Sequence, residues 1–385
     1  MAEARTIFLR RPRERTCDHL RRAYMVDSRS PRKFRSKNLS LGDFAMLFGD
    51  PGSAVEGADS AASVAVVDAP SGGYVNQLDI EEKVIGSTAS VRGYLISRDN
   101  HEELFGIREP YLILWHHVSL DAEFFERNPH CRAVVCASVG YNHVDIDAAR
   151  RHGVAIYHVP QYGTEEVADH TLALFLSAAR RLPELAEHVR DGGWDWRRAM
   201  GVHRLRGANW GIVGLGRIGL AVAVRAKAFG MRVSFHDPYN HPGIDKSMDL
   251  VRKSTLDELL ADSDVVSLHV PLDERTYHLI GARELGLMRQ GAYLVNTARG
   301  ALVDAGALET ALAEDRPCFV ALDVVDNEPA LPAWLRKHPR ALLSPHSAFY
   351  SFESLVELRT RAATAARELV SGSPVTAAVG VVPRT

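Results

Sequence analysis

Three side chains able to handle a small carboxylic acid stand at the ends of expected strands in the second half of the chain: Arg299, Glu328 and His346. A guanidinium can hold a carboxylate in a two-point fork and polarise the neighbouring carbonyl. An imidazole can give or take a proton near neutral pH, and a carboxylate beside it raises its pKa and fixes its orientation. Taken singly, each residue could be an ordinary surface ion pair, loop charge or helix-entry histidine. Together they predict hydride-transfer chemistry on a 2-hydroxy or 2-keto acid.

A glycine motif precedes these three residues. Residues 214–219 read Gly-Leu-Gly-Arg-Ile-Gly, directly after an expected strand and at the start of an expected helix. In this context the glycines allow a tight turn, a close approach to a pyrophosphate and helix–strand packing. Asp237 ends the next expected strand, where a carboxylate can accept hydrogen bonds from both hydroxyls of an adenosine ribose and repels a 2′-phosphate. Because no Arg or Lys follows until Lys246, the sequence predicts NAD rather than NADP.

The elements that must position these residues alternate between short apolar runs and helical patterns. The first series has strands at 61–67, 91–96, 111–115 and 132–137 and helices at 77–85 and 121–127, followed by a long helix at 167–181. The second has strands at 210–213, 231–237, 265–270, 292–297, 319–324 and 341–345 and helices at 217–229, 255–262, 282–288 and 305–314. Such alternation favours parallel sheets with helices on both faces. We therefore predict an α/β fold with two Rossmann-like, doubly wound domains.

The N-terminal segment has a different composition. Residues 1–40 carry twelve basic and four acidic side chains, and residues 49–60 are rich in Gly, Ala, Ser and Asp. A nucleic-acid-binding arm, a transit peptide, and translated sequence ahead of a start at Met25 or Met46 are the alternatives. Because no periodic face or aromatic interleaving supports an arm, we expect residues 1–60 to be a basic, flexible extension.

The overall composition excludes several classes of protein. The 385 residues carry a formal charge of −2 and contain no apolar run long enough to cross a bilayer, so neither a nucleic acid nor a membrane is an expected partner. The four cysteines form no CxxC pair, and no secretion signal is visible, which favours a reducing compartment and predicts a cytoplasmic location. The histidines show no ligand spacing, so no metal is expected.

Three further segments carry a resemblance to a known family. They are Arg-Ala-Lys-Ala-Phe-Gly at 225–230, Asp-Pro-Tyr at 237–239 and Met-Arg-Gln-Gly-Ala at 288–292. Together with the motifs above, over residues 61–380, the chain resembles the D-isomer-specific 2-hydroxyacid dehydrogenase family and, within it, the C-terminal binding protein branch. The resemblance implies a discontinuous substrate-binding domain (61–163 and 346–385), an inserted NAD-binding Rossmann domain (164–345), and a homodimer formed largely through the NAD-binding domain.

The resemblance also implies roles for individual residues. The family's catalytic residues match Arg299, Glu328 and His346. The family's nicotinamide is lined by the residues that match Thr297 to Arg299, and its carboxamide is held by the residue that matches Asp323. The loop that covers the adenosine matches residues 270–276. With the glycine motif, the expected cofactor site comprises Gly214, Gly216, Arg217, Ile218, Gly219, Asp237, Val270, Pro271, Thr276, Thr297, Ala298, Arg299, Asp323 and His346. The loop 138–142 resembles the one whose backbone receives the substrate carboxylate, and the expected substrate contacts are Val139, Gly140 and Phe349. This chain has Ser138 where the family has glycine. It also has Cys136 and Phe349 where the branch has arginine and tryptophan.

Two functions from different classes follow. The first is an NAD-dependent oxidoreductase that moves a hydride between nicotinamide and a small 2-hydroxy or 2-keto acid. Its acid–base group is His346, oriented by Glu328, and Arg299 binds the carboxylate. The alternative is an NADH-responsive scaffold or corepressor with little or no turnover. His116 and His117, at an expected strand end, could reach the pocket or could be a solvated strand terminus.

Overall fold

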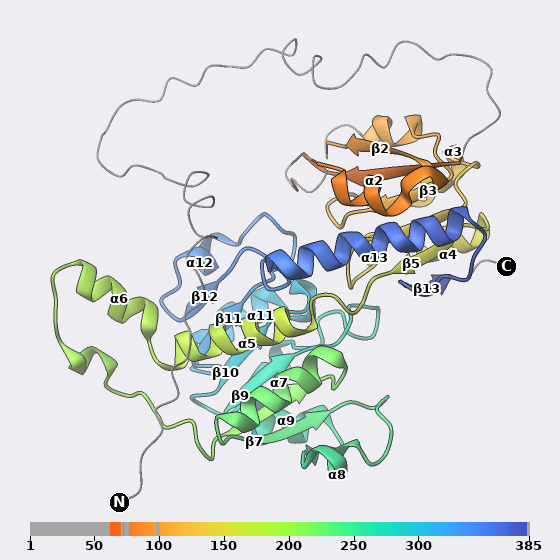
Figure 1. Cartoon of the computed structure of the whole chain (residues 1–385). Helices are drawn as coiled ribbons and strands as arrows, with labels where there is room; N and C mark the ends of the chain where they lie inside the picture. Colours follow the sequence, from red (N-terminus) through yellow and green to blue (C-terminus); the bar gives the residue numbers. More distant parts are fainter. Residues whose placement is uncertain (1–61, 71, 73–76, 98–100, 383–385) are drawn as a thin grey trace, which may run out of the picture. The chain divides into compact units, whose positions relative to one another are not determined.

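The computed structural model describes residues 62–70, 72, 77–97 and 101–382 (Figure 1). The basic extension expected at 1–60 lies outside the described residues. In the described part, each of two sheets carries an apolar cluster on either face. No described helix is both long and apolar enough to cross a bilayer.

The first sheet has the strand order β13-β5-β4-β3-β1-β2. Its strands are β1 (Ser63–Asp68), β2 (Ser90–Leu95), β3 (Tyr111–Leu114), β4 (Ala133–Cys136), β5 (Ala155–His158) and β13 (Val379–Val382). The first five pair in parallel, whereas β13 pairs antiparallel with β5, with Val379 opposite His158. Strand β13 therefore completes a sheet whose other five strands lie between residues 63 and 158.

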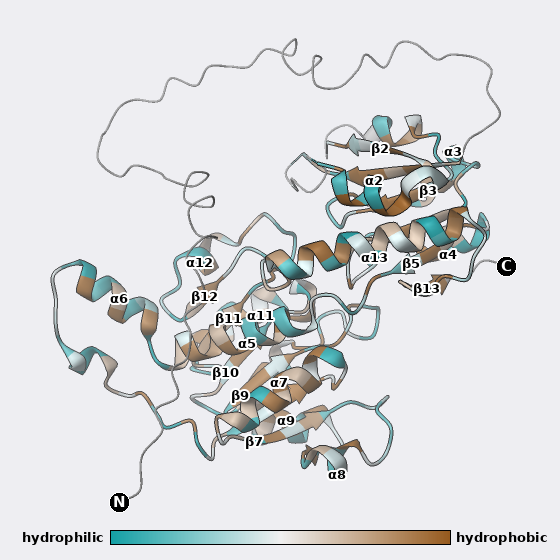
Figure 2. Cartoon of the chain, in the orientation of Figure 1, coloured by the Kyte–Doolittle hydropathy of each residue, from teal (hydrophilic) through white to brown (hydrophobic). Residues whose placement is uncertain are grey.

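Helices cover both faces of the first sheet. They are α2 (Asp79–Ile85), α3 (Ala122–Arg127), α4 (Ile146–Arg151) and α13 (Phe352–Val370). Polar and apolar residues alternate along α13 (Figure 2), and its buried alanines pack in one cluster with Val64, Val66 and Ile113. Arg359 of α13 donates from Nε and Nη2 to the buried carboxylate of Glu81 in α2, at 2.9 and 2.6 Å. This two-point ion pair ties the C-terminal helix to the first helix of the sheet.

The second sheet is parallel throughout, in the order β12-β11-β10-β9-β6-β7-β8. Its strands are β6 (Asn209–Val213), β7 (Arg232–His236), β8 (Val251–Arg252), β9 (Val265–Leu268), β10 (Tyr293–Asn296), β11 (Phe319–Leu322) and β12 (Ala341–Leu343). Its helices are α5 (Thr164–Ala179), α7 (Arg217–Ala228), α8 (Ile244–Met248), α9 (Leu256–Asp262), α10 (Ala282–Leu287), α11 (Ala305–Ala313) and α12 (Ala333–Arg336). Trp210 and Ile212 of β6 join the cluster with α5 and α7, while Val213 joins the opposite one. This alternation is that of a strand buried on both faces.

Helix α5 packs against the second sheet. The ring of Phe175 lies edge-on to that of Trp210, with centroids 4.8 Å apart. Arg225 of α7 donates to Glu165 at 2.5 Å and to Asp169 at 2.6 Å, both in α5. Beyond α5, helix α6 (Leu182–Arg190) has no buried residue and stands apart from the sheets in Figure 1.

The predicted fold class is confirmed, with differences in detail. All ten strands expected from the sequence are present, although most end one or two residues earlier than expected. The first sheet is not wholly parallel, because β13 joins its edge in the opposite direction. The pattern also missed β5, β8, α4, α6, α8, α12 and α13. Most of these elements are short, and α13 follows the last catalytic candidate without a break in composition.

Candidate active site

The glycine motif folds as the turn between β6 and α7. Gly214 has a φ of +89°, a conformation that favours glycine. A Cβ on Gly219 would overlap with the carbonyl oxygen of Gly214, so the helix packs directly on the turn. Gly216 faces open space ahead of the first N–H groups of α7. The turn thus has the room and the unpaired donors that the pyrophosphate of NAD requires.

Asp237 directly follows β7 and faces the same turn. Its Oδ2 accepts a hydrogen bond from the N–H of Leu215, inside the glycine motif, at 2.9 Å. Its Oδ1 accepts one from the N–H of Tyr239, also at 2.9 Å. The carboxylate is therefore fixed at the carboxyl edge of the sheet, beside the turn that suits the pyrophosphate. This is where the adenosine ribose lies in dinucleotide-binding folds.

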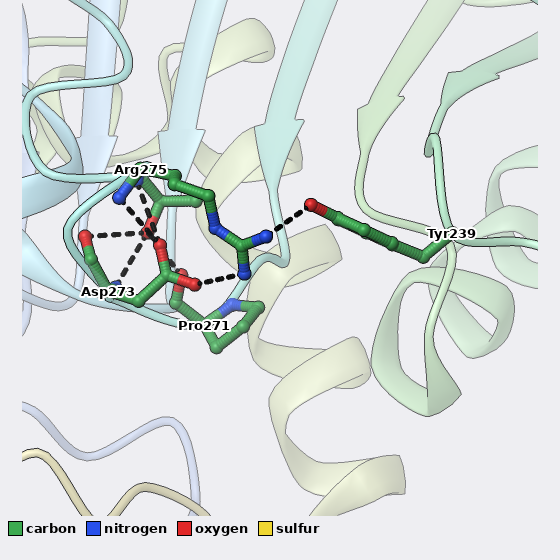
Figure 3. A network of polar contacts seen from close by, with 5 residues as sticks. Tyr239, Pro271, Asp273 and Arg275 are labelled. Carbon is green, nitrogen blue, oxygen red and sulfur yellow. Dashed lines mark hydrogen bonds and ion pairs between the residues drawn. The ribbon is translucent and has the colours of Figure 1, made fainter.

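A bridge of polar side chains joins the loop after β9 to the loop after β7 (Figure 3). Arg275 donates from Nη1 to the Oη of Tyr239 at 2.7 Å and from Nη2 to Oδ2 of Asp273 at 2.9 Å. The Oγ1 of Thr276 donates to the carbonyl of Pro271 at 2.7 Å and so closes the second loop on itself. Because β7 and β9 flank β6, the bridge connects the two loops on either side of the glycine motif. No basic residue follows shortly after Asp237 in the chain, but Arg275 reaches Tyr239 from a distant loop.

His346 and Glu328 form a close imidazole–carboxylate pair. Nδ1 of His346 lies 2.7 Å from Oε2 of Glu328. Since an ionised carboxylate only accepts hydrogen bonds, Nδ1 carries the proton and Nε2 is left to exchange one. Glu328 is fixed in turn, because its Oε1 accepts the N–H of Val325 at 2.9 Å. His346 has a φ of +51°, uncommon for a residue with a side chain.

The segment that carries His346 is held by a buried carboxylate. The oxygens of Asp323 accept the N–H groups of Ser347 and Ala348, each at 2.9 Å. Burial alone would raise the pKa of Asp323, but hydrogen bonds, led by the one with His170, hold this pKa below its usual range. The ionised Asp323 therefore positions the backbone around His346.

Arg299 reaches from the second sheet to the loop after β4. Its Nε donates to Oδ1 of Asn142 at 3.1 Å, and its Nη1 donates to the carbonyl of Ala298 at 2.6 Å. A Cβ on Gly140 would overlap with the Nη2 of Arg299, so the guanidinium lies directly on this loop. Burial lowers the pKa of Arg299, whereas the nearby charge of Glu328 acts in the opposite direction.

The turn after β10 is fixed by its neighbours. The Oγ1 atoms of Thr297 and Thr171 lie 2.8 Å apart in the interior, and the N–H of Ala298 donates to Oδ1 of Asn296 at 3.0 Å. Both contacts constrain the backbone that presents Arg299.

The remaining expected residues lie along the same edges of the two sheets. Val270 lies against Gly214, while Arg217 and Ile218 form the first turn of α7. On the other side, the carbonyl of Val139 is bonded to Nδ1 of His158 at 2.7 Å. The ring of Phe349 lies 6.4 Å from that of His346.

The sequence reading did not single out several residues that the structure places here. Asn142 holds Arg299, and Asp68, at the end of β1, is fully buried with its Oδ1 3.2 Å from Nδ1 of His117. Nε2 of His143 is buried without a hydrogen-bond partner among the described residues. A carboxylate ending a buried strand was the one signal in the sequence that could have identified Asp68.

Among the described residues, no cluster of His, Cys, Asp or Glu has the arrangement of a metal site. Cys131, Cys136 and Cys318 are free thiols, and burial raises the pKa of the first two to about 12. These buried thiols are therefore protonated and unreactive at neutral pH.

Fold and site together define a class of protein. A dinucleotide turn and a carboxylate-paired histidine occupy the carboxyl edge of one doubly wound sheet, and an arginine from that sheet lies against the other. This is the arrangement of an oxidoreductase that acts on a small acid with a nicotinamide cofactor.

Comparisons with known proteins identify the family. Residues 172–348 match the model of the NAD-binding domain of D-isomer specific 2-hydroxyacid dehydrogenases. Glyoxylate reductases of Korarchaeum cryptofilum and Aeropyrum pernix are 43% and 40% identical, over 61% and 63% of this chain and 72% and 75% of theirs. A solved glyoxylate reductase from Paecilomyes thermophila has a TM-score of 0.75 at 28% identity, over 83% of this chain and 99% of that one. The D-lactate dehydrogenase of Aquifex aeolicus, solved with NAD and lactic acid, has a TM-score of 0.72 at 29% identity, over 80% of this chain and 96% of that one.

The chain belongs to the D-isomer specific 2-hydroxyacid dehydrogenase family. It is an NAD-dependent 2-hydroxyacid dehydrogenase, so the predicted enzyme class and cofactor are confirmed.

Proposed function

We propose that this enzyme reduces a small 2-keto acid of the glyoxylate or hydroxypyruvate type to the corresponding D-2-hydroxy acid. The observation that carries the proposal is the His346–Glu328 pair, 2.7 Å apart, in a site where Arg299 lies against the loop at Gly140. The identity with glyoxylate reductases supports the same substrate class.

Each catalytic side chain has one task. NADH, when bound, supplies the hydride that goes to the carbonyl carbon of the substrate. The imidazolium form of His346 gives its Nε2 proton to the carbonyl oxygen, and Glu328, which accepts the hydrogen bond from Nδ1, fixes the orientation of the ring. Arg299 binds the substrate carboxylate, together with backbone N–H groups at Val139 and Gly140.

The two parts of the chain divide this work. Residues 61–163 and 346–385 would form the substrate-binding domain, with Phe349 bounding the pocket, and residues 164–345 the NAD-binding domain. Asp237 would bind the adenosine ribose, and the glycine motif would bind the pyrophosphate. Thr297, Ala298 and Asp323 would line the nicotinamide. The cytoplasmic location inferred from the cysteines belongs to the same proposal.

The test of the proposed function is the oxidation of NADH, followed at 340 nm, against a panel of 2-keto acids. The panel spans glyoxylate, hydroxypyruvate, pyruvate, and branched-chain, aryl and phosphorylated members. We expect turnover with glyoxylate or hydroxypyruvate at a kcat/KM at least tenfold above that of the aryl members. NADH binding without turnover of any member would contradict the proposal and favour the scaffold function.

Replacing Asp237 by alanine is expected to shift the cofactor preference toward NADPH. The change removes the carboxylate that repels a 2′-phosphate and leaves the Arg275 guanidinium nearby at Tyr239. The ratio of kcat/KM for NADH to that for NADPH should fall about 10- to 100-fold, as expected for one unfavourable charge pair near the surface. Asp249→Ala, an exposed carboxylate paired with Lys227, is the control. An unchanged ratio in Asp237→Ala would remove the ribose role.

A homodimer would form through residues 182–200, the segment after α5 that includes α6. Trp194 and Trp196 are 90% and 78% exposed, together with Met200 and Leu182. Large apolar side chains at this exposure are typical of a surface that another molecule covers. Replacing both tryptophans by serine should halve the mass measured by light scattering. Phe352→Ser, which changes an exposed aromatic on α13, should leave the dimer intact. A wild-type chain that is monomeric at micromolar concentration would contradict this proposal.

The scaffold function and the assignment to the C-terminal binding protein branch stay predictions. The relatives described above are named reductases and a dehydrogenase, and they favour an enzyme. The residues expected to bind a nucleic acid under a third hypothesis, in the basic extension, lie outside the described part of the chain.

A further inference from the structure

A second carboxylate–imidazole pair lies on the substrate side of the site. His117 follows β3, and its Nδ1 is 3.2 Å from Oδ1 of Asp68 at the end of the adjacent strand β1. Asp68 is completely buried, and its Oδ1 also accepts the N–H of Ala69 at 2.8 Å. A buried carboxylate held in this way fixes the orientation of the imidazole next to it.

His116 lies between this pair and the catalytic pair. Its ring centroid is 3.9 Å from that of His117, 5.4 Å from that of His346 and 6.2 Å from that of Phe349. The His116 ring therefore lies beside both the catalytic imidazole and Phe349, the expected boundary of the substrate pocket. Burial lowers the pKa of His116 well below its ordinary value, and the neighbours His117 and His346 act in the same direction.

This environment suits one kind of substituent. A neutral imidazole has one donor and one acceptor nitrogen, which matches a hydroxyl group. A second carboxylate would face the buried charge of Asp68 and the charge of Glu328, with Arg299 already engaged by the first. An alkyl group would offer no partner to Nε2 of His143, which is buried without a hydrogen-bond partner in the described structure and lies near His116.

We propose that His116 is a specificity-determining residue that binds a hydroxyl on the third carbon of the substrate, and that Asp68 acts through His117 to position it. The inference rests on the proposed function. The preferred substrates are 2-keto acids with a hydroxyl at C3, and the discrimination is against those of equal size that carry an alkyl group.

The experiment compares two substrates of equal size, hydroxypyruvate and 2-ketobutyrate. In the wild type, kcat/KM for hydroxypyruvate should exceed that for 2-ketobutyrate by about 100-fold or more, because a site built to bind a hydroxyl rejects its apolar analogue. His116→Phe should lower this ratio at least tenfold, whereas His116→Gln, which keeps a hydrogen-bonding group, should lower it less. His117→Asn should shift the ratio in the same direction, as expected of a positioning residue.

Two controls keep the outcomes distinct. NADH binding, measured by fluorescence, reports whether each variant is folded. His152→Phe replaces an exposed histidine whose Nδ1 is bonded to the carbonyl of Ala148 and whose ring stacks on that of Phe125. If glyoxylate is reduced but the ratio of the paired substrates is the same in wild type and His116→Phe, the inference is wrong and the proposed function stands. If no keto acid is reduced, the proposed function itself fails.

Discussion

Replacing His346 by alanine is expected to lower kcat for keto-acid reduction by about 10²- to 10⁴-fold, the range for loss of a general acid. The variant removes the imidazole that Glu328 holds at 2.7 Å. The neighbouring His116 cannot replace it as a proton donor, because the pKa of His116 lies well below its ordinary value. The dissociation constant for NADH should change far less than kcat. Stopped-flow single-turnover rates measure the chemical step directly.

The controls for this prediction test whether the effect is local. His338→Ala removes a histidine of the same half of the chain whose Nδ1 accepts the N–H of Arg340, away from the site. It should leave kcat within about twofold of the wild type, as is usual for distant surface changes. Glu328→Gln should lower kcat less than His346→Ala, because the amide can still contact Nδ1 but carries no charge. Wild-type turnover in His346→Ala would show that another group supplies the proton.

The second large effect is expected for Arg299→Lys. An ammonium group cannot reproduce the two-point fork on a carboxylate, nor the planar contact with the loop at Gly140. The kcat/KM for the keto acid should fall about 100-fold or more, with a clear rise in KM, since the lost contact binds the substrate in the ground state as well. Steady-state kinetics with glyoxylate and hydroxypyruvate measure both parameters.

A matched control is Arg289→Lys, which alters an exposed arginine paired with Asp264 at 2.7 Å. Because a lysine can keep a surface ion pair, its kinetics should equal those of the wild type. A kcat/KM in Arg299→Lys within threefold of the wild type would mean that the substrate carboxylate is bound elsewhere, and the backbone loop at 138–142 would be the first candidate.

Local patterns in the sequence predicted most of the second sheet and its cofactor turn. Strands buried on both faces are continuous apolar runs, and the glycine motif is recognisable because strand, turn and helix are contiguous in the chain. Arg299, Glu328 and His346 could be placed at one edge because parallel strands present their carboxyl ends together. The rule requires only that the strands are parallel, which the alternation of strands and helices indicates.

What the sequence could not supply are the contacts between distant segments. The antiparallel pairing of β13 with β5 joins segments more than 200 residues apart, and β13 is a four-residue edge strand with no sequence pattern that indicates its partner. Asp68 and His117 lie far apart in the chain, as do Arg275 and Tyr239, so no spacing rule connects these partners. Their proximity depends on strand order and on side-chain direction.

The absence of a basic residue shortly after Asp237 was the argument for NAD. In the structure, Arg275 arrives at Tyr239 from the loop after β9, and Nη1 of Arg252 lies 3.4 Å from the carbonyl oxygen of Asp237. We therefore expect the preference for NAD to depend on the carboxylate of Asp237 itself rather than on a lack of cations. This is why the Asp237→Ala variant is informative.

The most direct test of the central claim is transfer of label from the cofactor to the substrate. The enzyme is mixed with NADH deuterated at C4 of the nicotinamide and with glyoxylate or hydroxypyruvate, and the product is analysed by mass spectrometry and chiral chromatography. We expect one deuterium at C2 of the hydroxy acid and, for hydroxypyruvate, only the D-isomer. NADH that binds without giving labelled product, or label in the L-isomer, would contradict the account.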